Sequence, residues 1–591
     1  MHEEQMKTFQ FQAKRTGLRG LIAVTSSLLV AVPDPSHAIV SSFGGTNILN
    51  GVWINEAIGA DVFYDQGFGG QRAIVANIEA GTIWSGHQSL SGRIAQTIYN
   101  PSIIGTQLGQ ADWHATMVGQ TIGGSGLYTY QVGIAPLATM WSGAIATSWS
   151  AAPFVQYTGS FSNTDNSFLY AYRTATQTGI SGQNADVINS SWVYGDSAGS
   201  AEETIAIDAL LSAHQVVGVF SAGNSGPGSD SVGGPGTGYN GITVAALTNS
   251  AQHLAYDTVA DFSSRAPSAA YNPQSGITTP GLRATVDIAA PGDNLTLAFY
   301  GGRTGGHVAG TDPTGGSGDY YIGDMSGTSF SAPIVAGAAA LLVDAGKAFG
   351  IAEMTHPLVI KSVLMAGATP TIGWNNGQFL DGTVTRTLQA LDYASGAGAL
   401  DLRNSHDIYL GSSQLLAPSI YMTDGQTTLG VAGGGGSGAV ANSGWDLGTI
   451  QAGANIYTLA QTLAAGSEMS AVLTWYAQRG LGVDLSRAED VALSNLSLEI
   501  WRLDAVNGDQ LIGRSESPFG TVEHLRMTLA EAGNYQFRVV WDGQNYNTAA
   551  QPVFATDYGL AWSIASIPEP QSLLSICLAA FLLVRRHRAV C

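Results

Sequence analysis

Cysteine is nearly absent from this chain of 591 residues, which contains only Cys577 and Cys591. Because both lie within the last fifteen residues, no disulfide can cross-link the long stretch that precedes them. Basic residues are also few, since 23 Lys and Arg stand against 43 Asp and Glu, giving a formal net charge of −20. So acidic a chain lacks the positive surface that binds phosphate backbones, which argues against a nucleic-acid partner.

Charged residues of either sign are scarce as well. They make up 11% of the chain, while 76 residues are glycine, a composition that favours a loop-rich extracellular protein. The glycines are scattered among apolar runs, which argues against a disordered chain. The length exceeds what one compact domain usually needs, so we expect two domains.

The N-terminal residues 1–38 have the pattern of a secretory signal peptide. Basic residues precede the apolar run 21–32, and Ser36-His37-Ala38 supplies a small-x-small cleavage site. A buried helix is the alternative, but Pro33 would stop it at once. The sequence therefore predicts an exported protein.

The C-terminal residues 567–591 contain a second targeting pattern. Pro568-Glu569-Pro570 precedes the apolar run 573–584 and a basic cluster at 585–588. Twelve helical residues span about 18 Å, short of a bilayer core of about 30 Å, and the cluster favours a cytoplasmic end. The segment resembles the PEP-CTERM sorting tail of Gram-negative bacteria. That resemblance implies membrane contact through the tail, processing by an exosortase, and a final place at the cell surface or in the extracellular matrix; a permanent short anchor is the alternative.

The segment Gly327-Thr328-Ser329 stands before a long, alanine-rich apolar run that ends at Leu342. This pattern predicts a buried helix with a serine at its N-terminus, where unpaired N–H groups favour negative charge. Such a position suits a nucleophile whose attack creates an oxyanion. A simple helix-capping role for Ser329 is the alternative.

Three other segments supply possible partners for that serine. His114 starts another helix of small residues and could act as the base, and the apolar run 73–78 predicts a buried strand that ends in the carboxylate of Glu79. A further buried strand leads to Asn224, whose amide suits an oxyanion hole. Each residue alone has a structural explanation, but their joint order, carboxylate, His, Asn and Ser, favours a catalytic set.

These segments resemble the motifs of the subtilisin-like serine peptidases, or subtilases. The Ser329 segment is similar to the G-T-S-x-x-x-P motif, the His114 segment to H-G-T-x-V-A-G, and Ala222-Gly223-Asn224 to the A-G-N oxyanion segment. The resemblance extends from about residue 50 to about 402. It implies an α/β fold with a parallel sheet flanked by helices, and peptide-bond hydrolysis through an acyl-enzyme. The residues that it implies are Glu79, His114 and Ser329 for catalysis, Asn224 for the oxyanion, and Ser191, Trp192 and Gly223 for substrate binding.

The chain departs from the family pattern at two positions. Subtilases have Asp where this chain has Glu79, and the extra methylene moves the carboxylate by about one bond length. A Glu/His/Ser peptidase and a catalytically impaired surface or matrix binding protein therefore both remain open, with Asp112, Asp61 and Asp65 as other candidate acids. Val193 stands where the family usually has a small Gly, which predicts a primary specificity pocket that is narrowed or reshaped.

Beyond the peptidase region the sequence changes to short alternating strands, which predict an antiparallel β-sandwich. The sandwich resembles the jelly-roll accessory modules of secreted peptidases, and we expect its His524 to be structural. Protein or peptide substrates are the expected partners; no cofactor or catalytic metal is required, and structural calcium stays open. The predicted order is a signal peptide (1–38), a peptidase domain (39–402), a linker and start of the accessory module (403–445), the β-sandwich (446–566) and the sorting tail (567–591).

Overall fold

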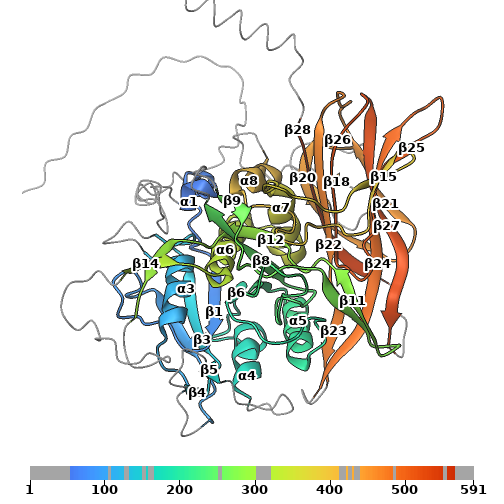
Figure 1. Cartoon of the computed structure of the whole chain (residues 1–591). Coiled ribbons are helices and arrows are strands. Elements are labelled where there is room, and N and C mark those ends of the chain that lie inside the picture. Colours follow the sequence, from blue (N-terminus) through green and yellow to red (C-terminus); the bar gives the residue numbers. More distant parts are fainter. Residues whose placement is uncertain are drawn as a thin grey trace, which may run out of the picture.

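The computed structural model describes residues 54–565, with gaps among them (Figure 1). The predicted signal peptide and sorting tail, and most of the predicted linker, lie outside the described residues. The gaps cover residues 104–107, 126–131, 150–154, 157–165, 250–255, 301–320, 412–420, 423–428, 431–438, 483–486 and 550–554.

The first domain is built on an eight-stranded sheet in the order β12-β8-β7-β6-β1-β3-β2, with β9 paired to β8. Every pairing is parallel except that of β9, as predicted from the buried apolar runs. The carboxyl ends of β1, β6 and β7 consequently meet at one edge of the sheet. The strands are β1 (Ile74–Glu79), β2 (Ile94–Ile98), β3 (Thr139–Ala144), β6 (Val187–Ser190), β7 (Val217–Ser221), β8 (Ile242–Asn249), β9 (Tyr256–Val259) and β12 (Ile288–Pro291).

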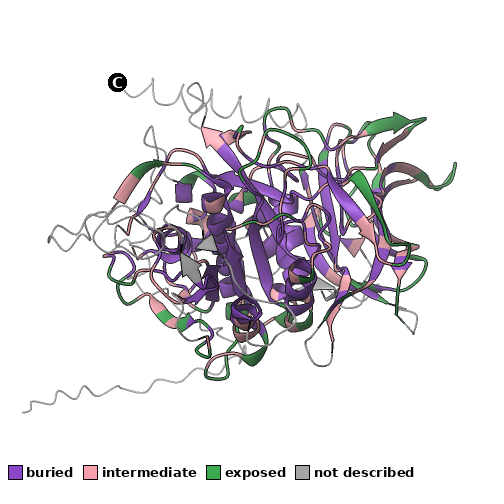
Figure 2. Cartoon of the chain, turned by 60° about the horizontal axis from the view of Figure 1, so that its bottom comes forward, coloured by how far each residue is buried: buried purple, intermediate pink, exposed green. Residues whose placement is uncertain are grey.

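Helix α6 (Thr328–Phe349) runs through the centre of this domain (Figure 1) and is buried over most of its length. Figure 2 shows that buried residues fill the interior of the molecule. The alanines and glycine of α6 allow close packing against α3 (Trp113–Gly123) and the sheet. Among the described residues it alone is long and apolar enough to span a membrane, but 94% of its most apolar window is buried, as in a core helix. The other helices are α1 (Ile54–Ala57), α2 (Asp61–Tyr64), α4 (Ser167–Arg173), α5 (Glu202–His214), α7 (Pro357–Gly367) and α8 (Leu402–Leu410), with a π-helix at Thr174–Thr178 and a 3₁₀ helix at Ala352–Thr355.

Among the described residues, three two-stranded sheets belong to the first domain, and a fourth lies within the predicted linker. The first two lie at β4 (Ser148–Trp149) with β5 (Val155–Gln156), and at β10 (Ser268–Asn272) with β11 (Ile277–Arg283). The others join β13 (Leu295–Ala298) to β14 (Tyr321–Met325), and β17 (Tyr421–Met422) to β18 (Leu429–Gly430). Strands β13 and β14 pair antiparallel shortly before Ser329 in the chain.

The second domain is a sandwich of two mainly antiparallel sheets around a core of large aromatic and aliphatic side chains. The inner sheet, in the order β20-β28-β22-β26, packs on α7 of the first domain. Its strands are β20 (Ser443–Ile450), β22 (Glu468–Trp475), β26 (Val522–Thr528) and β28 (Thr556–Ala565). The outer sheet contains β15 (Phe379–Asp381), β16 (Val384–Thr387), β19 (Ala439–Val440), β21 (Ala454–Leu459), β23 (Gln478–Leu481), β24 (Ala488–Leu503), β25 (Gln510–Ser515) and β27 (Asn534–Asn547).

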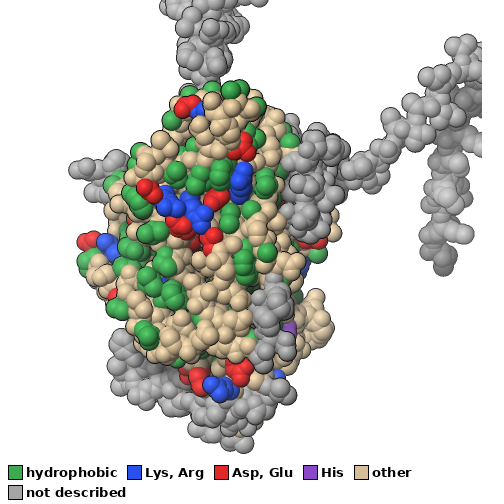
Figure 3. All heavy atoms as spheres, turned by 90° about the vertical axis from the view of Figure 1, so that its right-hand side faces the viewer, with side chains coloured by type: hydrophobic (Ala, Val, Ile, Leu, Met, Phe, Trp, Pro, Cys, Tyr) green, Lys and Arg blue, Asp and Glu red, His purple; other side chains and the backbone are tan. Residues whose placement is uncertain are grey.

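The two domains share this outer sheet. Strands β15 and β16 precede residue 402, where the first domain was predicted to end, yet β16 pairs with β25 of the sandwich. Figure 3 shows the sandwich side of the molecule, where basic side chains lie beside acidic ones. Arg514 of the outer sheet forms ion pairs with Glu499, Glu516 and Asp542, all of them in the sandwich.

Candidate active site

Glu79 is the last residue of β1, and its side chain is only 1% exposed. One carboxylate oxygen, Oε2, lies 3.1 Å from Nδ1 of His114, and the other, Oε1, accepts a hydrogen bond of 2.7 Å from the backbone N–H of Ser191. Both carboxylate oxygens of Glu79 are therefore hydrogen-bonded. The side chain reaches His114 while its second oxygen is held by the end of β6.

His114 is the second residue of α3, whose first turn is capped by Asp112. The Asp112 carboxylate accepts from the N–H of Ala115 and so fixes the start of the helix that carries the imidazole. Burial lowers the pKa of His114, but the hydrogen bond and charge of Glu79, with the charge of Asp112, outweigh burial and raise the pKa above its ordinary value. The imidazolium form is thus favoured next to Glu79.

Ser329 lies in the first turn of α6, as predicted from its position before the apolar run. Its hydroxyl donates to the backbone carbonyl of Ser191 at 3.1 Å, so Ser191 contacts both Glu79 and Ser329 through its main chain. The ring of Phe330 lies 5.9 Å from that of His114, which places the imidazole beside the start of α6. Ser329 and His114, both described, share no hydrogen bond in this structure.

Asn224 follows β7 and is held against the same end of α6. Its Oδ1 accepts from the backbone N–H and from the hydroxyl of Thr328, each at 2.9 Å. The amide nitrogen is therefore turned away from Thr328, and it lies 3.4 Å from the position that a Cβ on Gly327 would occupy. Sequence reasoning missed Thr328, although its place directly before Ser329 was a usable signal.

Comparison with known proteins decides the family. The model of the subtilase family matches residues 73–398, more than half of the chain and including all four of these residues. The chain belongs to the subtilase family. This confirms the resemblance that the motifs around His114 and Ser329 predicted.

Three curated relatives are similar to the subtilase domain over shorter stretches. Pyrolysin of Pyrococcus furiosus is 33% identical over 189 residues, which are 29% of this chain and 12% of pyrolysin. Serine protease AprX of Bacillus subtilis is 35% identical over 139 residues, 23% of this chain and 28% of AprX. Subtilisin of Bacillus sp. strain TA39 is 30% identical over 224 residues, 37% of this chain and 42% of the relative. The chain thus spans less than half the length of each relative.

The predicted substrate-binding residues of the subtilase domain lie close together. Trp192 is half-buried, donates from its indole N–H to the carbonyl of Ile78, and stacks on Tyr194. Val193 is 44% exposed, and a Cβ placed on Gly223 would lie 3.6 Å from its Cγ1. Gly223 has a φ of +105°, a conformation that favours glycine and brings the chain close to Val193. An apolar side chain therefore stands next to the oxyanion segment.

The other candidate acids have different partners. Asp112 caps α3, and burial raises the pKa of its carboxyl to about 6 despite the opposing charge of His114. Asp61 forms an ion pair with Arg403 on the surface of the domain. Asp65 is an exposed residue at the end of α2. Of these carboxylates and Glu79, Glu79 alone is hydrogen-bonded to the ring of His114 in the part of the chain that the structure describes.

His524 is separate from this set and lies on β26, where the inner sheet of the sandwich packs against the first domain. Its ring is fully buried, its Nε2 contacts the hydroxyl of Ser470, and burial lowers its pKa to about 3. The ring also packs edge-on against Trp374. A neutral histidine in such a setting fits the expected structural role. Within the described residues, no group of three or more His, Cys, Asp or Glu side chains is placed to hold a metal ion.

Proposed function

We propose that this subtilase is a serine endopeptidase that hydrolyses peptide bonds through an acyl-enzyme. Ser329 is the nucleophile, His114 the general base and then the general acid, and Glu79 the residue that orients the imidazole. The amide nitrogen of Asn224 and the N–H groups at the start of α6 stabilise the oxyanion of the tetrahedral intermediate. Protein or peptide chains are the substrates.

The reaction proceeds in two halves. The Ser329 hydroxyl exchanges its bond to Ser191 for one to Nε2 of His114, attacks the carbonyl carbon of the scissile bond, and passes its proton to the imidazole. His114 returns that proton to the leaving amine, and a water then attacks the ester in the same way. Glu79 orients the His114 ring and stabilises the imidazolium that forms in each half.

The contact between Glu79 and His114 carries this proposal. A catalytically impaired binding protein would have no need of a carboxylate at this place, whereas Glu79 reaches Nδ1 at 3.1 Å and is itself held by Ser191. The added methylene is accommodated without loss of the hydrogen bond. The observation therefore favours the peptidase over the binding protein.

Burst kinetics with a p-nitrophenyl ester test the proposal on the purified chain. An acyl-enzyme requires a rapid release of nitrophenol equal to the enzyme concentration, followed by slower turnover. Cleavage of an unfolded protein under the same conditions would extend the result to peptide bonds. A chain that gives neither a burst nor cleavage would contradict the proposal.

The raised pKa of His114 predicts the pH below which activity falls. Only the neutral imidazole can accept the Ser329 proton, so kcat/KM rises with pH through the pKa of His114. We expect the midpoint of that rise to lie above the ordinary value of 6.5. Glu79→Gln removes the charge that raises the pKa, so the midpoint should move to lower pH. A midpoint that is the same in both proteins would show that Glu79 does not act on His114.

Val193 is proposed to restrict the primary specificity pocket. Its side chain stands beside Gly223 and is 3.2 Å, at Cβ, from the position of a Cβ on Gly233. Val193→Gly should therefore favour substrates with a large aromatic P1 residue. The ratio of their kcat/KM to that of substrates with a small P1 residue should rise by about tenfold or more. Profiling a peptide library with both proteins measures this ratio. Equal P1 preferences would mean that Val193 does not border the pocket.

Export and processing of the tail complete the proposal. The signal-peptide pattern at 1–38 and the PEP-CTERM-like pattern at 567–591 support a peptidase that acts outside a Gram-negative cell, with an exosortase as processing partner. Cysteine is absent from all residues between these two segments, so folding outside the cell needs no disulfide formation.

A further inference from the structure

A buried ion pair joins the sandwich to the subtilase domain. Arg479, on β23, has a side chain that is only 1% exposed. Its guanidinium donates to Asp208 of α5 at 2.9 Å and to Asp490 of β24 at 3.1 Å. One arginine from the sandwich thus neutralises a buried carboxylate of each domain.

The Asp208 carboxylate in turn holds a loop of the subtilase domain. It accepts hydrogen bonds from the backbone N–H groups of Tyr239, at 2.7 Å, and Asn240, at 3.1 Å. The Asn240 side chain pairs with both main-chain groups of Ala477, two residues before Arg479. Residues 239–240 are therefore held by Ala477 of the sandwich and by Asp208, whose charge is neutralised by Arg479 of the sandwich.

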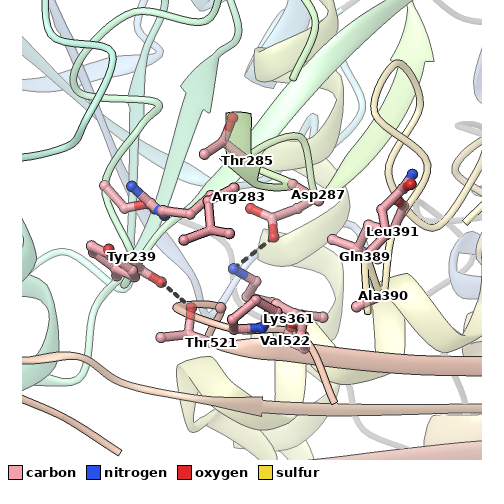
Figure 4. A pocket seen from close by; sticks show the side chains of 16 residues that line it. Tyr239, Arg283, Thr285, Asp287, Lys361, Gln389, Ala390, Leu391, Thr521 and Val522 are labelled. Atoms are coloured by element: carbon pink, nitrogen blue, oxygen red, sulfur yellow. Dashed lines mark hydrogen bonds and ion pairs between the residues drawn. The ribbon is translucent and has the colours of Figure 1, made fainter. Parts of the chain in front are cut away.

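Tyr239 also contacts two guanidinium groups through its ring and a residue of the sandwich through its carbonyl. The guanidinium of Arg283 lies 3.6 Å from the ring centroid, and that of Arg479 lies 4.7 Å from it. Figure 4 shows Tyr239 and Arg283 at one end of a small interdomain cavity, with Thr521 of the sandwich bonded to Tyr239. The cavity has a volume of about 20 Å³, enough for about one water. The Tyr239 side chain itself is only 3% exposed.

The same loop begins at residues 233–234, which lie beside Val193 at the proposed specificity pocket. Gly234 exchanges two backbone hydrogen bonds with Tyr194, and Gly233 faces Val193. Thr237 donates from its hydroxyl to the carbonyl of Asp196, and Arg283 donates to the carbonyl of Thr237. These hydrogen bonds, together with the main chain of residues 234–239, therefore connect Arg479 with the proposed specificity pocket.

We propose that Arg479 is a positioning residue for this pocket, so that the sandwich helps to set the affinity of the peptidase for its substrate. Removing the guanidinium leaves Asp208 and Asp490 buried without their ion-pair partner, while the charge of Arg283 still acts on Asp208. Asp208 should then hold the loop less firmly. Because the proposal rests on the endopeptidase function, its test needs one readout that depends on activity and one that does not.

The full chain with Arg479→Met is compared with wild type and with Arg514→Met, well below the unfolding temperature. Arg514→Met is the matched control, since it removes an arginine with three ion pairs that all lie within the sandwich. We expect Arg479→Met to raise KM for a peptide by on the order of tenfold. A small fluorophosphonate tests Ser329 and His114 without filling the pocket. The rate at which it labels Arg479→Met should stay within about twofold of the wild-type rate. An unchanged KM, or an equal change in Arg514→Met, would overturn the proposal.

Hydrogen exchange at residues 233–241 is the readout that does not require activity. Loss of Arg479 should speed exchange of the Tyr239 and Asn240 amides, and Arg514→Met should leave it unchanged. If Arg479→Met does not fold, Arg479→Lys takes its place, because a lysine can contact one carboxylate but not bridge both in the same way. Unaltered exchange in the folded variant would refute a positioning role, whereas failure of the wild type to hydrolyse peptides would refute only the peptidase function.

Discussion

Ser329→Ala is expected to lower kcat for peptide hydrolysis by about 10⁶, because removing the serine of a subtilisin triad costs that much. The Ser329 hydroxyl donates a single hydrogen bond, to the carbonyl of Ser191, so its removal should leave the fold intact. Steady-state hydrolysis of a peptide substrate measures the loss. Peptide binding to the variant should stay near that of the wild type.

The matched control is Ser331→Ala, two residues further along the same helix. The Ser331 hydroxyl is buried and has no hydrogen-bond partner among the described residues, so its removal leaves no group unpaired. We expect activity within about threefold of the wild type. A similar collapse of activity in both variants would point to a general disturbance of α6 and would contradict the assigned role of Ser329.

Glu79→Gln should lower kcat by about 10⁴, close to the loss from removing the acid of a subtilisin triad. The amide retains the shape of the side chain, but it carries no charge to stabilise the imidazolium and can present an N–H to Nδ1. Glu79→Asp should lie between Gln and wild type, because the shorter side chain cannot keep both the contact to His114 and that to Ser191. Single-turnover rates for the three proteins measure the series.

Asp112→Asn provides the control for loss of a buried negative charge near His114. Asp112 caps α3 and does not touch the ring, so its replacement should cost stability and less than about tenfold in kcat. If Asp112→Asn were as inactive as Glu79→Gln, Asp112 would be acting as the acid. A Glu79→Asp protein more active than the wild type would show that Glu79 impairs the site.

The sequence alone could predict the parallel sheet and the residues of the proposed site. Glu79 and Asn224 each follow an apolar run, and parallel strands place their carboxyl ends at one edge, so these two residues could be expected near one another. Ser329 is brought to the same edge by helix α6. The uncertain point was Glu79, since pattern alone does not say whether a longer side chain is turned toward His114. That depends on the second hydrogen bond from Ser191, which is a main-chain contact and has no signature in the sequence.

The connection between the domains could not be predicted for a similar reason. Strands β15 and β16 are short and partly polar, so nothing local indicates that they extend a sheet whose other strands come more than fifty residues later. Arg479 likewise lies in a short strand, β23, whose sequence has no distinctive pattern. Its partners Asp208 and Asp490 lie in separate domains, and only the packing of β23 on α5 brings the three charges together.

The central claim, that Ser329 is activated by His114 with Glu79 as its acid, is tested most directly by the intact mass after treatment with a fluorophosphonate. The account predicts one adduct per wild-type chain, mapped to Ser329 and absent from Ser329→Ala, with slower labelling in Glu79→Asp. A wild-type chain that gains no adduct, while Glu79→Asp is labelled at Ser329, would contradict the claim and leave substrate binding as the function of this site.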